Sequence, residues 1–181
     1  MCGRVVGWRR AANVPSDLLA EAHVGHAYVG TCAQGPGKLG TGAPWGDSGV
    51  ATGEAVNATA VLGGRAVGSL RVSEADARER HRGISHHSLT AYGRVAMAPA
   101  DLPVPLLGGD FGDLVLDQAR ELARESAGRL QLREVDTSGL VDALASSPVH
   151  LSTMGRGLDL DQASFLAAAA AGRHAATLLS P

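Results

Sequence analysis

The spacing of apolar residues predicts helices over more than a third of this chain. The clearest case is residues 112–127, where Val115, Ala119 and Leu122 form one apolar stripe at helical spacing and charged residues occupy the other side. Gly128 follows that stripe, as expected for a residue that ends a helix. Shorter helical patterns begin at potential N-caps, and they predict helices at residues 16–23 (cap Ser16), 48–62 (cap Ser48, end Gly63), 138–144 (cap Ser138) and from Asp159 or Asp161 to about Leu179.

Other segments have the patterns of β-strands. Residues 88–98 place Leu89, Ala91, Gly93, Val95 and Met97 at every second position, which is the period of a strand with one buried face. Short apolar runs predict further strands at residues 26–33, 65–72, 130–135 and 148–151. Three prolines at positions 99, 103 and 105 exclude a helix there and predict an extended connection.

Strands that alternate with helices are typical of an α/β fold. We therefore expect a three-layer, open, largely parallel and Rossmann-like sheet. Residues 1–15 are expected to be a poorly ordered N-terminal segment, and residues 16–181 to form a single α/β domain.

Composition narrows the class of protein. With 181 residues, 45% of them hydrophobic and 19% charged, the chain is long enough for one globular domain. It contains no apolar run of the ~18 residues that cross a bilayer and no export signal, so we expect a cytoplasmic protein without a membrane partner. The net charge is −2 and the arginines are scattered, which argues against nucleic acid as a partner. Cys2 and Cys32 are expected to be free thiols.

A glycine-rich run after the strand predicted at 26–33 is the first candidate site. Such glycines allow backbone N–H groups to converge on an anion, and a helix N-terminus nearby adds favourable dipole charge. The candidate ligand-binding residues are Gly35, Gly37, Lys38, Gly40, Thr41, Gly42 and Ser48. The run does not have the context of a dinucleotide fingerprint, and Lys38 is followed by Leu39 rather than by the Ser or Thr of a phosphate-binding loop. The cofactor therefore stays unknown, and a turn that only packs closely is the alternative.

Residues 80–88 are the second candidate, because this segment holds three of the seven histidines. Imidazoles titrate near neutral pH and bind transition metals. Arg82, Ser85 and His86 are candidates for catalysis, and His81, His86 and His87 are weaker candidates for a metal site. On a strand the adjacent His86 and His87 point to opposite faces, so that only one of them joins His81. A solvated loop is the alternative.

A third glycine turn, residues 152–157, again follows a predicted strand and precedes a helix. If the glycine loops share one edge of the sheet, Arg156 and Lys38 frame a single anionic ligand there. The alternative is a helix entry without a ligand.

Several short ungapped segments also resemble the bacterial family known as domain of unknown function 3866. These segments are residues 33–37, 39–42, 45–46, 53–57, 62–64, 68–73, 80–83, 85–88, 152–157 and 165–174. The resemblance extends over about residues 18–179 and leaves out residues 1–15. Members of the family are about twice as long, which implies that this chain is an incomplete C-terminal half, with a homo-oligomer or a missing N-terminal half as partner. The resemblance implies no activity and no catalytic residue.

Three hypotheses about function follow. The first is the binding of an anionic or phosphate-bearing small molecule on the glycine-rich loop. The second is a non-catalytic structural or interaction fragment. The third is a metal-dependent hydrolase built on His81, His86 and His87.

Overall fold

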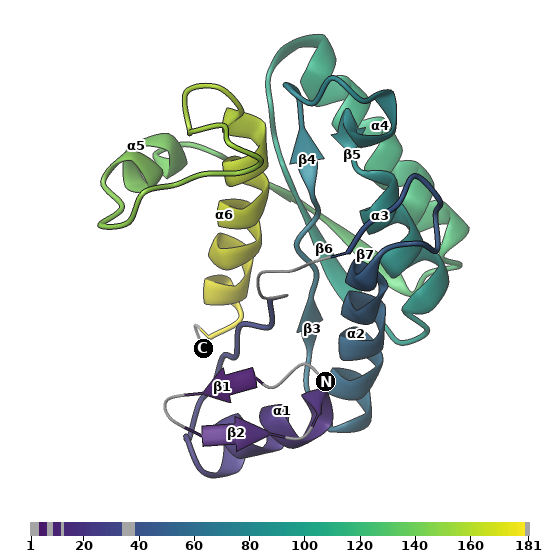
Figure 1. The fold of residues 1–181 in the computed structure, drawn as a ribbon, viewed down its shortest axis with the longest axis vertical. Helices are drawn as coiled ribbons and strands as arrows, with labels where there is room; N and C mark the ends of the chain where they lie inside the picture. Colours follow the sequence, from purple (N-terminus) through teal and green to yellow (C-terminus); the bar gives the residue numbers. More distant parts are fainter. Residues whose placement is uncertain (1–3, 7–8, 12, 34–38, 180–181) are drawn as a thin grey trace.

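A three-stranded parallel sheet in the order β3-β6-β7 is the centre of the fold (Figure 1). The computed structural model describes residues 4–6, 9–11, 13–33 and 39–179. The strands are β3 (Ala66–Val67), β6 (Ala100–Pro105) and β7 (Leu130–Val135). The predicted α/β class with a parallel sheet is therefore confirmed.

Helices cover both faces of this sheet. The helices α4 (Gly109–Glu125) and α6 (Gln162–Thr177) lie on opposite sides of it (Figure 1). Arg120 of α4 pairs with Glu134 of β7 at 3.2 Å, whereas His174 of α6 lies 2.8 Å from Asp101 of β6. Because side chains alternate along a strand and Glu134 is in register with Val104, these two contacts lie on opposite faces. The result is three layers.

Two prolines lie within the middle strand, β6. The backbone N–H groups of Ala100 and Leu106 donate towards β7, while Asp101 accepts from Gly68 on the β3 side. Pro103 and Pro105 have the same orientation as Asp101, so their nitrogens, which carry no hydrogen, face the β3 side. Since β3 pairs only with Ala100 and Asp101, these prolines leave no gap in a described ladder. The segment is extended, as predicted, but it is a strand rather than a connection.

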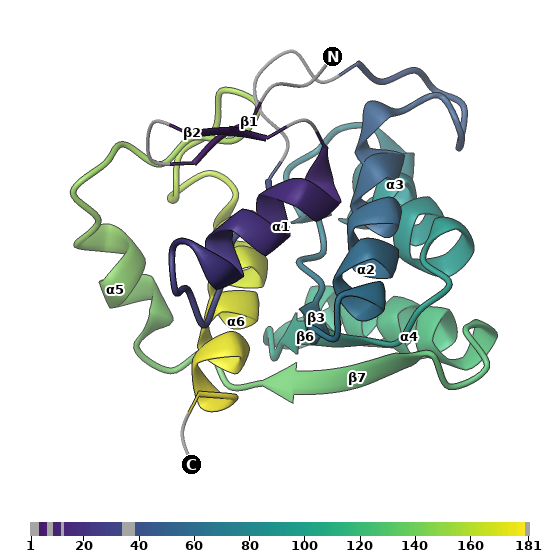
Figure 2. The same cartoon turned by 90° about the horizontal axis from the view of Figure 1, so that it is seen from below.

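The N-terminal part of the chain lies against α2 (Ala51–Val61). A hairpin of β1 (Arg4–Val6) and β2 (Arg9–Ala11) precedes α1 (Val14–His23), and Figure 2 shows α1 beside α2. The N-cap of α1 is Asn13 and not the predicted Ser16, which instead completes a capping box with Asn13. A 3₁₀ helix, η1 (Ser48–Val50), leads into α2, and α5 (Leu140–Ala145) precedes α6.

The segment between β3 and β6 forms an excursion beyond the carboxyl end of β3 (Figure 1). Its first part is an antiparallel pair, β4 (Val72–Ser73) and β5 (Gly83–Ile84), joined through the 3₁₀ helix η2 (Glu79–His81). Its second part is α3 (His86–Thr90), followed by a π-helical turn, η3 (Ala91–Val95). The strand predicted over 88–98 is therefore wrong.

Tertiary contacts decide that this segment is helical. The buried Tyr92 hydroxyl accepts from Ser69 N–H at 3.0 Å and donates to its carbonyl oxygen at 3.2 Å. The side chain of Asn57 accepts from Met97 N–H at 2.7 Å and closes the end of the turn. Gly53 of α2 packs so closely that a Cβ there would lie 2.4 Å from the Ala91 carbonyl oxygen. None of these partners is local in sequence.

Two more predicted strands are wrong, one is divided, and one strand and several helices are confirmed. Residues 26–33 are exposed throughout, with Tyr28 94% exposed, and Val149 in the segment 148–151 is 65% exposed. The strand predicted over 65–72 is divided between β3 and β4, which belong to different sheets. The predictions for β7, α4, α2 and α6 are confirmed apart from a few residues at their ends. Among the described residues, no helix is both long and apolar enough to cross a membrane.

A buried carboxylate joins one outer layer, α6, to the sheet. Asp101 of β6 is 4% exposed and accepts from His174 Nε2 at 2.8 Å, Arg65 Nε at 2.9 Å and Arg133 Nε at 3.2 Å. Burial alone raises the pKa of Asp101, but the hydrogen bonds from His174, Arg65 and Arg133 together outweigh burial and lower it. Asp101 is therefore ionised in the folded protein and holds α6 against β6.

Candidate metal centre

Three histidines meet where the chain passes from η2 through β5 into α3. His81 is the last residue of η2, and His86 and His87 are the first two residues of α3. Successive residues of a helix differ in direction by only about 100°, so both rings reach the side where His81 lies. We expected the rings of His86 and His87 to point to opposite faces because we placed them on a strand. They lie on a helix, so that expectation is wrong.

The three rings are in mutual contact. Their centroids are 3.9 Å apart for His86 and His87, 4.9 Å for His81 and His86, and 5.2 Å for His81 and His87. One nitrogen of each ring lies within 4.8 Å of the other two. In a tetrahedral zinc site, with Zn–N bonds of about 2.0–2.1 Å, the nitrogens are about 3.3 Å apart. The rings therefore need to close by about 1.5 Å, on the scale of a side-chain adjustment.

Two of the rings have a polar group close to their Nδ1 atom. His87 Nδ1 lies 2.9 Å from the carboxylate oxygen Oδ2 of Asp47, and His81 Nδ1 lies 2.8 Å from Ser85 Oγ. A metal-binding histidine usually donates its second ring N–H to such a partner, which fixes the tautomer and leaves Nε2 for the ion. In His86, by contrast, Nε2 is buried and has no hydrogen-bond partner among the described residues.

The electrostatic environment keeps two of the three rings, His81 and His86, neutral. Burial, followed by the positive charges of Arg78 and Arg71, lowers the pKa of His81 to about 4. Burial also lowers the pKa of His86, and the charge of Arg80 acts in the same direction. Both rings are therefore neutral near pH 7, and a neutral imidazole has the lone pair that a metal ion requires.

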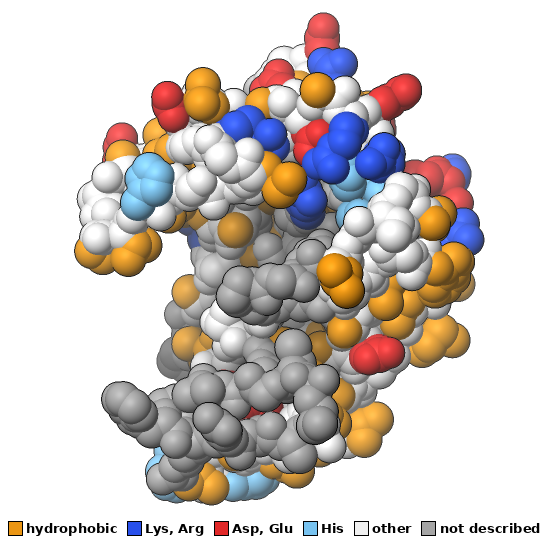
Figure 3. Space-filling model, viewed as in Figure 1, with side chains coloured by type: hydrophobic (Ala, Val, Ile, Leu, Met, Phe, Trp, Pro, Cys, Tyr) orange, Lys and Arg blue, Asp and Glu red, His pale blue; other side chains and the backbone are white. Residues whose placement is uncertain are grey.

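Arginines gather around one carboxylate beside the histidines. Arg78 donates to the buried Asp76 through Nε at 2.9 Å and a terminal nitrogen at 2.8 Å, and Arg71 contacts the same carboxylate at 3.3 Å. The hydrogen bond from Arg78 holds the pKa of Asp76 well below its usual range. On this face, Figure 3 shows basic side chains gathered next to histidine side chains.

Arg156 joins the same network from the turn before α6. Its Nε donates to Asp161 at 3.1 Å, and one terminal nitrogen lies 3.8 Å from Asp76. That terminal nitrogen is buried and has no hydrogen-bond partner among the described residues. Asp161, which is 2% exposed, also accepts from Ser73 Oγ at 2.6 Å. The beginning of α6 is thereby tied to β4.

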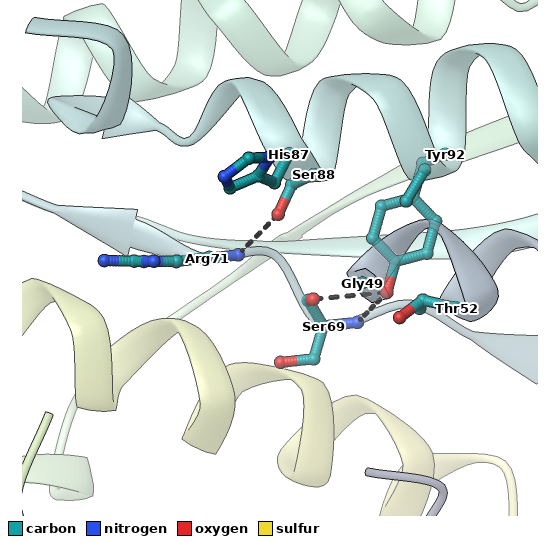
Figure 4. Close-up of a pocket in the computed structure, with 8 residues that line it drawn as sticks. Gly49, Thr52, Ser69, Arg71, His87, Ser88 and Tyr92 are labelled. Atoms are coloured by element: carbon teal, nitrogen blue, oxygen red, sulfur yellow. Dashed lines mark hydrogen bonds between the residues drawn. The ribbon is translucent and has the colours of Figure 1, made fainter. Parts of the chain in front are cut away.

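A cavity of about 160 Å³ lies beside His87. Arg71 lines it together with the hydroxyl-bearing residues Thr52, Ser69, Ser88 and Tyr92. Figure 4 shows these side chains around one space, with the backbone N–H of Arg71 donating to Ser88 Oγ at 2.9 Å. Burial raises the pKa of Tyr92 to about 12, so its hydroxyl stays protonated. The cavity is therefore bordered mainly by neutral residues that carry hydroxyl groups, and Arg71 is the one permanently charged residue among those that line it.

The described part of the glycine-rich loop folds back on itself next to the histidines. Gly40 and Asp47 form an antiparallel bridge, and a Cβ placed on Gly40 would lie 3.7 Å from His87 Nε2. A Cβ at position 46 would lie 1.9 Å from Thr41 Oγ1, so a larger residue there would force the Thr41 side chain to move. The loop's own oxygens engage the amides of Leu39, Thr41, Ala43, Gly46 and Ser48. These amides are therefore not free for an anion.

The predicted site residues divide into three groups. His81, Ser85, His86 and His87 come together in one cluster. Arg156 lies in the Asp76 network, while Arg82 is exposed. Gly40, Thr41, Gly42 and Ser48 belong to the folded loop, and Gly35, Gly37 and Lys38 lie outside the described residues.

The sequence interpretation missed Asp47, Arg71 and Asp76. Asp47 is the only acidic residue between positions 22 and 53, so a single carboxylate in a glycine-rich run was a usable signal. No comparable signal marks Arg71 or Asp76, because their role depends on the antiparallel pairing of β4 and β5.

Comparison with known proteins identifies a family but no activity. No curated protein and no solved structure matched the chain. Residues 4–172 match the family described as protein of unknown function (DUF3866). The match begins at residue 4, within the segment that we expected to lie outside the resemblance. The family therefore includes nearly the whole chain, and this protein belongs to DUF3866.

Proposed function

We propose that this protein is a metal-dependent hydrolase whose centre holds one divalent transition metal ion, with zinc as the best fit, between His81, His86 and His87. The observation that carries the proposal is the convergence of three imidazole nitrogens within 4.8 Å of one another, with His81 and His87 buried. Segments that are polar and charged in sequence rarely bury histidines side by side unless a function requires it.

The donor set fits hydrolytic chemistry. Three imidazoles around zinc leave a fourth position for water, and zinc lowers the pKa of such a water to about 7. Asp47 lies next to Nδ1 of His87 and orients the ring, as a carboxylate does in many zinc sites. His86 is only partly buried, so the cluster has one side close to solvent.

Ser85 does not support a competing nucleophilic mechanism. Its hydroxyl lies 2.8 Å from His81, which is the distance of a nucleophile and its base. However, Ser85 is 0% exposed and is not among the residues that line the cavity. We therefore assign Ser85 to positioning the ring of His81.

Metal analysis tests the proposal directly. We expect the purified protein, stripped with a chelator and dialysed against zinc, to hold about one zinc per chain by elemental analysis. Titration with Co²⁺ should give the visible absorption of a tetrahedral nitrogen-bound ion. A protein that holds no stoichiometric transition metal after either treatment would contradict the proposal.

Asp47→Asn is expected to weaken zinc binding about 10- to 100-fold while leaving the stoichiometry unchanged. Asparagine retains an oxygen for the Gly49 N–H, which Asp47 Oδ1 accepts at 2.7 Å, but it lacks the charge that faces His87. Competition with a chromophoric chelator measures the affinity. Asp113→Asn on the surface of α4 is the matched control, and equal affinities of the two variants would exclude a role for Asp47.

A second candidate is the binding of an anionic small molecule by the glycine-rich loop. What favours it is the position of Gly40 and Asp47 directly against the histidine cluster. The engaged amides of the loop count against it. The non-catalytic alternative predicts that the chain binds neither metal nor anion.

A further inference from the structure

We propose that Arg71 and Arg156 form an anion site beside the three histidines, and that this site binds the phosphate group of a small phosphate monoester. The inference rests on the proposed function, because the phosphate monoester is then the substrate of the hydrolase. It places the anion at two guanidinium groups rather than at the backbone of the glycine-rich loop. Arg71 belongs to the excursion between β3 and β6, and Arg156 belongs to the turn before α6.

The first observation is that more positive than negative charge converges at this point. Arg71, Arg78 and Arg156 approach the single carboxylate of Asp76 at 3.3, 2.8 and 3.8 Å. Asp161 adds a second negative charge at 3.1 Å from Arg156. Three guanidinium groups and two carboxylates leave one positive charge in excess, and an anion placed here would balance it.

The second observation is that two of these guanidinium groups retain hydrogen-bonding capacity. Arg78 is committed to Asp76 by two of its nitrogens. Arg71 contacts Asp76 through one terminal nitrogen only, and a terminal nitrogen of Arg156 is buried with no hydrogen-bond partner among the described residues. A guanidinium has five N–H donors, so both groups have donors left for a ligand. An unpartnered buried donor is costly unless something fills its place.

The third observation is the cavity. Arg71 and His87 both border it, so a group bound there lies next to one arginine of the proposed anion site and one histidine of the proposed metal centre. Its volume of about 160 Å³ exceeds the ≈30 Å³ share of one water about fivefold, which suits a tetrahedral oxyanion with a small substituent. Ser69, Ser88 and Thr52 also border this cavity.

These features favour phosphate over a carboxylate. Arginine matches the oxygens of phosphate with its planar set of donors, and several donors around a small space suit a tetrahedral dianion better than a flat monoanion. In the reaction, the oxygen of one water forms a new P–O bond and the P–O bond to the alcohol oxygen breaks. The proton lost by the water passes to the leaving oxygen. The products are the alcohol and inorganic phosphate.

Calorimetric titration of the zinc-loaded protein with inorganic phosphate, at constant ionic strength, tests the inference. We expect Arg71→Gln and Arg156→Gln each to weaken phosphate binding about 10- to 100-fold. Both substitutions keep the backbone contacts, including the hydrogen bond from Arg71 N–H to Ser88. Arg120→Gln, in an exposed ion pair on α4, is the matched control and should bind phosphate like the unaltered protein.

The zinc content and circular dichroism of each sample separate the two proposals. If zinc is bound and folding is intact but phosphate binding does not depend on Arg71 or Arg156, this inference is wrong and the metal centre stands. If phosphate binding depends on these arginines in a protein that binds no zinc, the anion site stands and the hydrolase proposal fails. Lys38→Ala reports on the glycine-rich loop, and a loss of phosphate binding in that variant alone would overturn the arginine site. Turnover of p-nitrophenyl phosphate gives a second readout, in which Arg71→Gln should lower kcat/KM by a similar factor.

Discussion

His81→Ala is expected to abolish stoichiometric zinc binding, with a loss of affinity of at least about 100-fold. Binding free energies of structural zinc sites are about 10–16 kcal/mol for four ligands, so each ligand carries several kcal/mol. Removing one of three imidazoles also leaves an incomplete donor set that solvent has to fill. Elemental analysis after dialysis, together with chelator competition, measures the loss.

His81 is 2% exposed, so His81→Ala also leaves a space in the protein and can destabilise the fold. Two further variants separate loss of zinc binding from loss of folding. His86→Ala removes a ligand that is only partly buried, so it should lose zinc with little effect on folding. His150→Ala removes an exposed histidine and should bind zinc normally. If His81→Ala and His86→Ala both retain one tightly bound zinc per chain, the three histidines are not the metal centre.

Asp101→Asn is expected to lower the free energy of unfolding at pH 7 by about 3 kcal/mol. The carboxylate is 4% exposed and accepts from three basic side chains on three different segments of the chain. Arg65 and Arg133 are 57% and 42% exposed, so solvent screens their share, and most of the loss comes from the contact with the largely buried His174. For a chain of this length, the melting temperature should fall by about 6–12 °C.

The effect of Asp101→Asn should depend on pH with a definite sign. The pKa of Asp101 is lower in the folded protein than in the unfolded chain, so its ionised form contributes stability above about pH 4. That contribution disappears as the pH falls through the unfolded and then the folded pKa. The difference between the two proteins should therefore shrink as the pH falls below about pH 4.

Urea unfolding at several pH values, in the presence of a chelator, measures this difference without a contribution from bound metal. Asp117→Asn is the matched control, because Asp117 is 77% exposed on α4 and its pair with Arg120 is 3.5 Å long. A stability of Asp101→Asn equal to that of the unaltered protein at pH 7 would show that the network around Asp101 contributes nothing.

The sequence by itself determined the elements that depend on local pattern. The apolar stripe of α4 with Val115, Ala119 and Leu122, and the run of β7, are readable because amphipathic period and glycine stops act within a few residues. The α/β class followed from the alternation of these elements. The three histidines were also evident as a dense group, although nothing in their spacing showed that they share a site.

Only the tertiary structure decided how that group is arranged. The period-two pattern over residues 88–98 also fits a buried helical turn, and contacts from Tyr92 to Ser69 and from Asn57 to Met97 select the helix. That choice turns His86 and His87 to the same side, and the bridge between Gly40 and Asp47 brings a carboxylate from a distant loop to His87. Pairing of β4 with β5 likewise brings Arg71 and Asp76 to the cluster. Hydrogen bonds between residues far apart in the chain made these choices, and local propensity carries no information about such partners.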